Sequence, residues 1–263
     1  MTERASNALI GHTGFVGSNL DRQHDFGSRY NSKNIEDIAG SRFDLLVFSG
    51  AQAKKWWANA NPEADRQGLE RAIEALRDVQ ARQAVLISTI DVLPEDTPHA
   101  DEGVACSADG MHAYGAHRLW LEQSFRQQFP GCLIVRLPGL FGPGLKKNVI
   151  FDLLTGNQLE KINPASSFQY YDLGRLWPDI ATALEAGLEL VHFFTEPVGT
   201  RAVIDGFFPG VAVGSDAAPA AAYDYRTRHG ALFGGGPRYI ESAASVLERM
   251  GAFIDVARRN GLS

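Results

Sequence analysis

Cysteine is scarce in this sequence, and it contains no long apolar run. Cys106 and Cys132 are the only cysteines in 263 residues, and their spacing does not match a metal site. We therefore expect two reduced thiols, no disulfide framework and a cytoplasmic protein. No apolar stretch approaches the length of a membrane span, and the first four residues lack the apolar core of a signal peptide.

Clusters of basic residues are also few. The formal net charge is −6 at pH 7, and basic residues gather only in the pairs Lys54-Lys55 and Lys146-Lys147. Nucleic-acid binding depends on many contacts between cations and phosphates, so we do not expect a nucleic-acid partner. No pair among the seven histidines combines metal-ligand spacing with a supporting carboxylate, so we expect no metal.

Glycine, by contrast, is plentiful, and three of the 27 glycines follow the first apolar run at regular spacing. After Ala8-Leu9-Ile10 come Gly11, Gly14 and Gly17. In a strand-to-helix turn of this spacing, the glycines permit the turn, the approach of a pyrophosphate and close packing of the helix. The free N–H groups of the helix then hold the phosphate. The pattern predicts a dinucleotide site, with a structural turn as the alternative, and cofactor contacts from Gly11, Thr13, Gly14, Phe15, Val16 and Gly17.

Strand-like and helix-like segments alternate through the first 145 residues. We predict strands over 7–11, 26–30, 44–48, 84–88 and 132–137, and helices over 15–22, 62–82 and 113–129. Beyond residue 145 the alternation decays, and we predict helices over 151–154, 176–190 and 241–259. This order indicates an α/β fold with a doubly wound parallel sheet of Rossmann type over 1–145. Residues 146–263 would form a small substrate lobe, interwoven with closing sheet and helix elements.

Hydroxyl side chains end the strand predicted over 84–88. Ser88 and Thr89 lie at its carboxyl end, which faces the ligand crevice in an open parallel sheet, so their hydroxyls would lie near a bound dinucleotide and Ser88 would contact it. Tyr114 opens a predicted helix, and Arg118 follows at i+4 on the same helical face. A cation beside a phenol lowers the tyrosine pKa from its usual value of ~10. Thr89 would then hold a substrate oxygen while Tyr114 transfers a proton. The alternative is a surface contact between tyrosine and arginine.

Together, Gly11-x-x-Gly14-x-x-Gly17, Ser88-Thr89 and Tyr114-Gly-Ala-His-Arg118 resemble the extended short-chain dehydrogenase/reductases. More narrowly, they resemble the NAD-dependent epimerase/dehydratase family, which acts on nucleotide sugars. The resemblance covers roughly residues 6 to 182 and includes segments 136–143 and 168–172. It implies that Tyr114 is the acid/base, Thr89 the substrate-orienting hydroxyl and residue 118 a contact to the cofactor ribose. It also implies that the chain passes the nicotinamide after the fifth strand, at Leu137 and Pro138.

Several positions depart from the family pattern. Arg118 stands where the family has lysine; arginine keeps the charge but does not deprotonate. Gly139 stands where a substrate-contacting asparagine is common, and the chain is shorter than typical members. Asp91 occupies the place of a carboxylate in sugar dehydratases, where it would be a second acid/base or a cap of the following loop. Two interpretations remain: an active oxidoreductase, epimerase or dehydratase on a small-molecule substrate, or a catalytically weakened dinucleotide-binding sensor or assembly protein.

The end of the second predicted strand bears on the choice of cofactor. It lacks the acidic residue with which NAD-specific sites bind the ribose hydroxyls. Asn31, Ser32 and Lys33 offer donors and a cation suited to a 2′-phosphate, so we expect NADP in preference to NAD. Small residues after the third strand would leave room beside the adenine ribose: Ser49, Gly50 and Ala51. The helix after Tyr114 carries more apolar surface than one core face needs, which suggests a homodimer.

Overall fold

A computed structural model of the protein describes residues 6–95, 97–215 and 219–262. The chain divides into two compact units. The first contains the described residues up to Thr97, together with Gly103–Arg136 and Leu176–Val191. The second contains Pro98–Glu102, Leu137–Arg175 and the described residues from His192 onwards. Both units combine segments that are far apart in the sequence, and the predicted division at residue 145 stays a prediction.

The first unit holds most of a six-stranded parallel sheet with strand order β2-β1-β3-β4-β5-β9. The strands are β1 (Asn7–Ile10), β2 (Ser28–Tyr30), β3 (Arg42–Phe48), β4 (Gln80–Thr89), β5 (Leu133–Leu137) and β9 (Leu190–His192). The strand β1 pairs in parallel with both β2 and β3, so that Ile10 lies opposite Tyr30 and Phe48. The order reverses between β1 and β3, which confirms the predicted doubly wound α/β fold.

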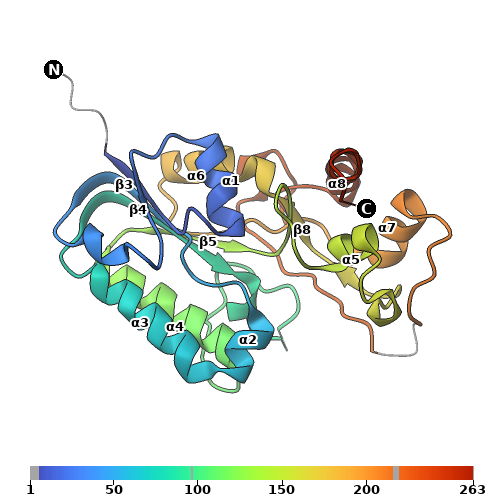
Figure 1. Ribbon diagram of the computed structural model, residues 1–263, viewed down its shortest axis with the longest axis horizontal. Helices are drawn as coiled ribbons and strands as arrows, with labels where there is room; N and C mark the ends of the chain where they lie inside the picture. The colour runs from blue at the N-terminus through green and yellow to red at the C-terminus, as the bar shows by residue number, and fades with distance from the viewer. Residues whose placement is uncertain (1–5, 96, 216–218, 263) are drawn as a thin grey trace. The chain divides into compact units, whose positions relative to one another are not determined.

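Helices cover both faces of this sheet within the first unit. Helices α1 (Phe15–Gln23) and α6 (Leu176–Glu185) lie on one face, and α3 (Pro62–Ala75) and α4 (Ala113–Gln128) lie on the other (Figure 1). A short helix, α2 (Lys55–Ala60), follows β3. Because both faces are covered, the residues of β3 from Leu45 to Phe48 are all buried, as in a central parallel strand. No helix in the described part of the chain is both long and apolar enough to cross a bilayer.

The helix predicted over 62–82 is too long. Helix α3 ends at Ala75, and Gln80 already begins β4. Leu76 and Val79 are both buried and continue the apolar spacing of the helix through the turn. The spacing of apolar residues therefore does not show where α3 ends, because the turn after the helix also buries apolar side chains against the core.

The helix predicted over 176–190 is also too long. Helix α6 ends at Glu185, and β9 begins at Leu190. Between them, Gly187 has a φ of +67°, in the left-handed region that favours glycine and ends helices. Residues 186–189 of the predicted helix therefore form a turn, and only Leu190 belongs to the edge strand β9.

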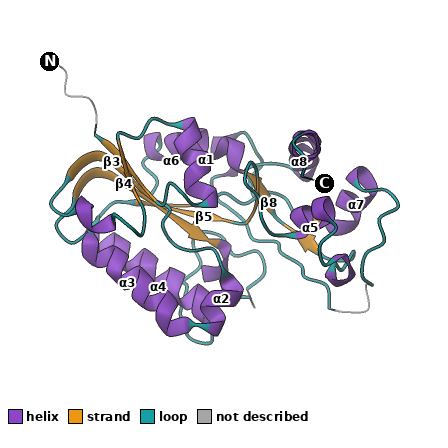
Figure 2. Cartoon of the chain, in the orientation of Figure 1, coloured by secondary structure: helices purple, strands orange, loops and turns teal. Residues whose placement is uncertain are grey.

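The second unit is assembled from short elements. It contains β6 (Gly139–Phe141), β7 (Ser167–Phe168), β8 (Tyr170–Asp172), β10 (Val198–Gly199), α5 (Val149–Thr155), α7 (Thr200–Phe207) and α8 (Ala243–Arg259). Strand β6 pairs in parallel with β8, and β10 pairs in antiparallel with β7. Loops join these elements (Figure 2). The core includes Tyr171 and Phe193, both fully buried, whose stacked ring centroids lie 5.5 Å apart.

Candidate functional site

The glycine turn joins β1 to α1 at the carboxyl end of the sheet. Gly11 has a φ of +89°, and a Cβ there would lie 2.5 Å from the carbonyl oxygen of Ser49. A Cβ on Gly17 would overlap the carbonyl oxygen of Gly11, so only glycine lets α1 pack this closely. Helix α1 begins after Gly14, and no side chain caps its first N–H groups. The turn thus presents an uncapped helix N-terminus suited to a phosphate.

The segment 49–51 lies directly against this turn. The backbone N–H and the hydroxyl of Ser49 both donate to the carbonyl oxygen of Ile10, each at 2.9 Å. The structure therefore brings this segment and the glycine turn together where the strand order reverses, the place at which open α/β sheets bind ligands. The remaining turn residues predicted to contact a cofactor are accessible: Thr13 is exposed, and Phe15 and Val16 are half-buried.

Residues 31–33 form a short turn after β2. The side-chain oxygen of Asn31 accepts a hydrogen bond from the backbone N–H of Lys33 at 2.9 Å. The backbone N–H of Asn31 in turn donates to the side chain of Asn34 at 2.7 Å. Ser32 and Lys33 are exposed. The side-chain oxygen of Asn31 therefore shapes the turn, while a hydroxyl and an ammonium group face the surface.

Tyr114 and Arg118 meet on one face of α4, as their spacing predicts. Only 6% of Tyr114 is exposed, and the guanidinium carbon of Arg118 lies 4.4 Å from the centroid of its ring. The backbone N–H of Tyr114 donates to the side chain of Asn59 at 2.9 Å. A Cβ on Gly115 would overlap the carbonyl oxygen of Asp91, so this glycine lets the start of α4 approach the turn that follows β4. Sequence reasoning missed both Asn59 and Gly115.

The expectation that the pKa of Tyr114 lies below its usual value is wrong for this structure, although Arg118 acts in the expected direction. Burial raises the pKa of the phenol, and the charge of Asp91 adds to this effect. The charge of Arg118 and hydrogen bonds to Thr89 and Arg118 act in the opposite direction without outweighing burial. Tyr114 is therefore held as a neutral proton donor in the protein without ligands.

Arg118 is bound to a carboxylate that the sequence analysis did not single out. Its guanidinium donates two hydrogen bonds to Asp65 of α3, at 2.9 and 3.0 Å, and one to the carbonyl oxygen of Gln52 at 2.6 Å. The ring of His117 also contacts Asp65, at 2.8 Å. Burial disfavours the charge of Asp65, but the hydrogen bonds and charges of Arg118 and His117 hold its pKa below the usual value. The Nε of Arg118 is buried and has no hydrogen-bond partner.

Thr89 and Asp91 form a second polar group beside Tyr114. The Thr89 hydroxyl donates to Asp91 Oδ2 at 3.0 Å, and the backbone N–H of Asp91 donates to the Thr89 hydroxyl at 3.2 Å. Thr89, rather than Asp91, therefore caps the turn that follows β4. Lys55 of α2 donates to Asp91 Oδ1 at 2.6 Å, and His112 Nε2 lies 3.8 Å from the same oxygen. In the sequence Lys55 was only one member of a basic pair, so nothing there indicated this contact.

Ser88 takes part in a buried network rather than in an open site. Its hydroxyl donates to Glu122 Oε1 at 2.6 Å. Glu122 also accepts two hydrogen bonds from Arg136, at 3.0 and 2.7 Å, and both of these charged residues are almost fully buried. The contact between Ser88 and a cofactor stays a prediction. Because the Ser88 hydroxyl already donates its proton to Glu122, it could only accept a hydrogen bond from the cofactor.

The remaining predicted cofactor residues, Leu137 and Pro138, belong to the second unit and are buried. Gly139 follows them in β6, and a Cβ there would lie 2.9 Å from the carbonyl oxygen of Gln169. The pairing of β6 with β8 therefore explains why a larger side chain such as asparagine does not fit at Gly139.

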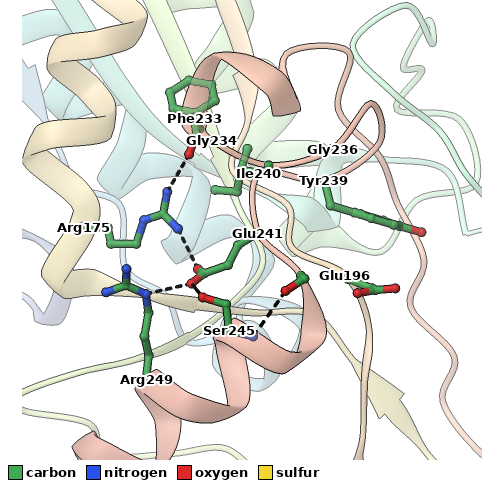
Figure 3. Close-up of a pocket in the computed structure, with 12 residues that line it drawn as sticks. Arg175, Glu196, Phe233, Gly234, Gly236, Tyr239, Ile240, Glu241, Ser245 and Arg249 are labelled. Atoms are coloured by element: carbon green, nitrogen blue, oxygen red, sulfur yellow. Dashed lines mark hydrogen bonds and ion pairs between the residues drawn. The ribbon is translucent and has the colours of Figure 1, made fainter.

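A cavity of about 550 Å³ in the second unit contains none of the predicted site residues. Arg175 and Arg249 both donate to the Glu241 carboxylate, each at 2.7 Å, and Figure 3 shows the two guanidinium groups converging on it. The start of α8 lies in the same cavity, where the backbone N–H of Ala243 donates to Glu196 at 2.8 Å. The two arginines of this cavity are thus paired with Glu241, and Glu196 accepts a backbone hydrogen bond at the start of α8. Nowhere in the described residues do three His, Cys, Asp or Glu side chains gather as metal ligands would.

No protein-family model and no curated protein matches the chain, but solved structures share its fold. A UDP-N-acetylglucosamine 4-epimerase from Methanobrevibacter ruminantium M1 is 13% identical, with a TM-score of 0.75 over 97% of this chain and 98% of that one. The dTDP-4-dehydrorhamnose reductase of Bacillus anthracis str. Ames, in complex with NADP, is 16% identical, with a TM-score of 0.71 over 94% and 98%. A dTDP-glucose 4,6-dehydratase from Streptomyces venezuelae, with NAD bound, is 16% identical, with a TM-score of 0.70 over 96% and 97%. These similarities establish the Rossmann-type fold and leave the reaction open.

Proposed function

We propose that the protein is an NAD(P)-dependent oxidoreductase, epimerase or dehydratase of the short-chain type. The observation that carries this proposal is the buried Tyr114, with the guanidinium of Arg118 over its ring. The glycine turn lies in the same unit, at the end of β1. The three structures of similar fold are named for reactions on nucleotide sugars, which supports a nucleotide sugar or a related carbonyl or hydroxyl compound as substrate.

Three features of the chain fit a bound dinucleotide. Side chains larger than hydrogen are excluded at Gly11 and Gly17, the first N–H groups of α1 are uncapped, and the buried Nε of Arg118 lacks a partner. When bound, the nicotinamide would supply or accept the hydride. We propose that the dinucleotide is held by Gly11, Thr13, Gly14, Phe15, Val16, Gly17, Asn31, Ser32, Lys33, Ser49, Gly50, Ala51, Ser88, Tyr114, Arg118, Leu137 and Pro138. The exposed Lys33 favours NADP over NAD, since its ammonium can pair with a 2′-phosphate.

The chemistry of the chain's own residues follows from their contacts. Tyr114 donates a proton to, or accepts one from, the substrate oxygen, and Thr89 orients the reacting hydroxyl groups. Arg118 stabilises the phenolate and contacts the cofactor ribose, and Asp91 is a second acid–base group. We further propose that residues 146–263 supply the substrate lobe. We also propose that the chain forms a homodimer, and light scattering on the purified protein tests this oligomeric state directly.

One observation favours a second candidate, a dinucleotide-binding sensor or assembly protein with weakened chemistry. Two bonds to Asp65 and one to Gln52 already engage the Arg118 guanidinium. Arginine also does not release a proton as lysine does. Under this alternative, the chain binds the dinucleotide through its glycine turn but does not turn over a substrate.

Calorimetric titration with NADP(H) and NAD(H) tests the shared premise of both candidates. We expect micromolar binding in the wild type and a loss of at least about tenfold in Gly17→Ala, because the new Cβ displaces α1 from the turn. Gly68→Ala is the matched control, since a Cβ at this position in α3 meets no atom within 4 Å. Absence of binding in the wild type would remove both candidates.

Tyr114→Phe then separates the enzyme from the binding protein. With nucleotide sugars supplied to the cofactor-loaded protein, an enzyme loses about 10²-fold or more in turnover, a much larger effect than the loss of one contact to the cofactor has on its affinity. A binding protein shows no turnover in the wild type or in the variant.

A further inference from the structure

His112 stands directly before helix α4 and caps the first turn of this helix with its side chain. The backbone N–H of Gly115 donates to His112 Nδ1 at 3.0 Å. Because a backbone N–H can only donate, Nδ1 is the accepting nitrogen of the ring and carries no proton. The hydrogen-bond network therefore assigns the proton of the neutral ring to Nε2. Histidine is not one of the residues usually found at this position, where serine, threonine, aspartate and asparagine prevail.

The Nε2 of His112 lies beside the polar group formed by Thr89 and Asp91. It is 3.8 Å from Asp91 Oδ1, which is too long for a hydrogen bond. The His112 and Tyr114 ring centroids lie 6.3 Å apart, and 27% of the His112 side chain is exposed. The Nε2–H group of His112 is thus an accessible hydrogen-bond donor next to the candidate acid/base.

Asp91 supplies an acceptor that matches this donor. The Thr89 hydroxyl donates to Asp91 Oδ2 at 3.0 Å, and Lys55 donates to Oδ1 at 2.6 Å. Each carboxylate oxygen can accept more than one hydrogen bond, so Oδ1 can take another. An oxygen atom at a distance of about 2.9 Å from both His112 Nε2 and Asp91 Oδ1 would bridge the two. Such an oxygen must accept from Nε2 and donate to Oδ1, which a hydroxyl can do and a carbonyl oxygen cannot.

We propose that His112 and Asp91 together bind a hydroxyl group of the substrate, with His112 as the donor and Asp91 as the acceptor. This inference rests on the proposed function and deepens it, because it requires a substrate with a hydroxyl near the oxygen that Tyr114 protonates. No covalent bond forms or breaks in this contact. The bond from Gly115 to Nδ1 fixes which ring nitrogen reaches the substrate, so the cap of α4 also orients the donor.

NMR of the His112 ring tests the orientation of this donor without a substrate. Long-range correlation of the ring protons with the two nitrogens shows which nitrogen is protonated in the full chain. The signals are assigned by their loss in His112→Asn. We expect the proton of the neutral ring on Nε2. A proton on Nδ1 would overturn the inference, because such a ring could neither accept from Gly115 nor offer a donor at Nε2.

Two variants separate the donor of His112 from its cap. His112→Asn keeps an acceptor for the Gly115 N–H, since asparagine is a preferred cap, but its side chain is too short to reach the place of Nε2. His112→Gln carries an amide N–H about as far as Nε2, but glutamine is not a preferred cap. With UDP-glucose or dTDP-glucose and the cofactor-loaded protein, we expect turnover to fall about 10²-fold in His112→Asn and by less in His112→Gln. Urea denaturation should show the opposite order, with a lower midpoint in His112→Gln than in His112→Asn.

His229→Asn is the matched control. His229 also stands before a helical turn, Gly230–Phe233, but its side chain makes no cap hydrogen bond. This variant should turn over as the wild type does.

The inference fails if His112→Asn turns over as the wild type does, or if turnover in the two His112 variants follows their stability. His112 would then be only a cap. Failure of the proposed function gives a different result, in which the wild type binds no dinucleotide in calorimetry or converts neither sugar. The substrate contact is then removed together with the enzyme. Turnover in the wild type that His112→Asn leaves unchanged removes only the inference about His112.

Discussion

Helix α4 takes part in two buried arginine–carboxylate pairs, and the two pairs differ in how completely they are satisfied. Glu122 accepts two hydrogen bonds from Arg136 and a third from the hydroxyl of Ser88. Arg118 also donates two bonds to its partner, Asp65, but its buried Nε has no partner and its guanidinium lies over the Tyr114 ring. The Glu122–Arg136 pair, in which the hydrogen bonds are satisfied, fixes the packing of a helix on a sheet. The Asp65–Arg118 pair leaves a buried donor unsatisfied beside a titratable group, which marks a place where a ligand or a proton acts.

The largest effect on stability is expected from breaking the satisfied pair, Glu122 with Arg136. Glu122→Ala leaves the Arg136 cation buried without its counter-charge and should lower the free energy of unfolding by about 3–5 kcal/mol. Urea denaturation followed by tryptophan fluorescence measures this loss. The double variant Glu122→Met with Arg136→Met removes both charges and should be clearly more stable than Glu122→Ala. Equal stability of the two variants would show that the ion pair is not what holds this region.

A smaller loss of stability, accompanied by a change at Tyr114, is expected from the pair at the candidate site. Asp65→Asn keeps the shape of the side chain but removes its charge, and it should lower the free energy of unfolding by about 2 kcal/mol. Because Arg118 is then no longer neutralised, its charge acts more strongly on the phenol, and the pKa of Tyr114 should fall. NMR titration of the Tyr114 side chain measures this shift. If Glu122→Ala lowers the Tyr114 pKa as much as Asp65→Asn does, the distinction between the two pairs is wrong.

The sequence predicted the sheet of the first unit better than the ends of its helices. The run Leu45–Phe48 is apolar on both faces, which only a central parallel strand requires, and it is buried throughout. The end of α3 was misplaced because Leu76 and Val79 continue the apolar spacing within a turn. Strands of two or three residues in the second unit, such as β7 and β10, are too short to carry a periodic pattern.

At the candidate site, the residues predicted from the sequence were those with a local signature. The glycine spacing and the i, i+4 relation of Tyr114 and Arg118 need only neighbouring positions in the chain. Asp65 and Lys55 carry no such signature, because they reach the site from α3 and α2 through the packing of separate helices. The direction of the Tyr114 pKa shift was missed for the same reason: burial depends on the tertiary structure, and it outweighs the adjacent cation.

The smallest expected effect is the dependence of stability on acid pH that Asp65 contributes. Its pKa in the folded protein lies below the usual value of ~3.9, so in acid the unfolded chain binds a proton that the folded protein does not. Stability from Asp65 is therefore fully present above the unfolded pKa and is lost as the pH falls through the folded one. Urea denaturation below about pH 5 should show a steeper loss in the wild type than in Asp65→Asn, which has no carboxylate to protonate. If stability falls with pH equally in the two proteins, Arg118 and His117 do not favour the charged form of Asp65. The two arginine pairs would then differ only in the Nε of Arg118, which has no hydrogen-bond partner.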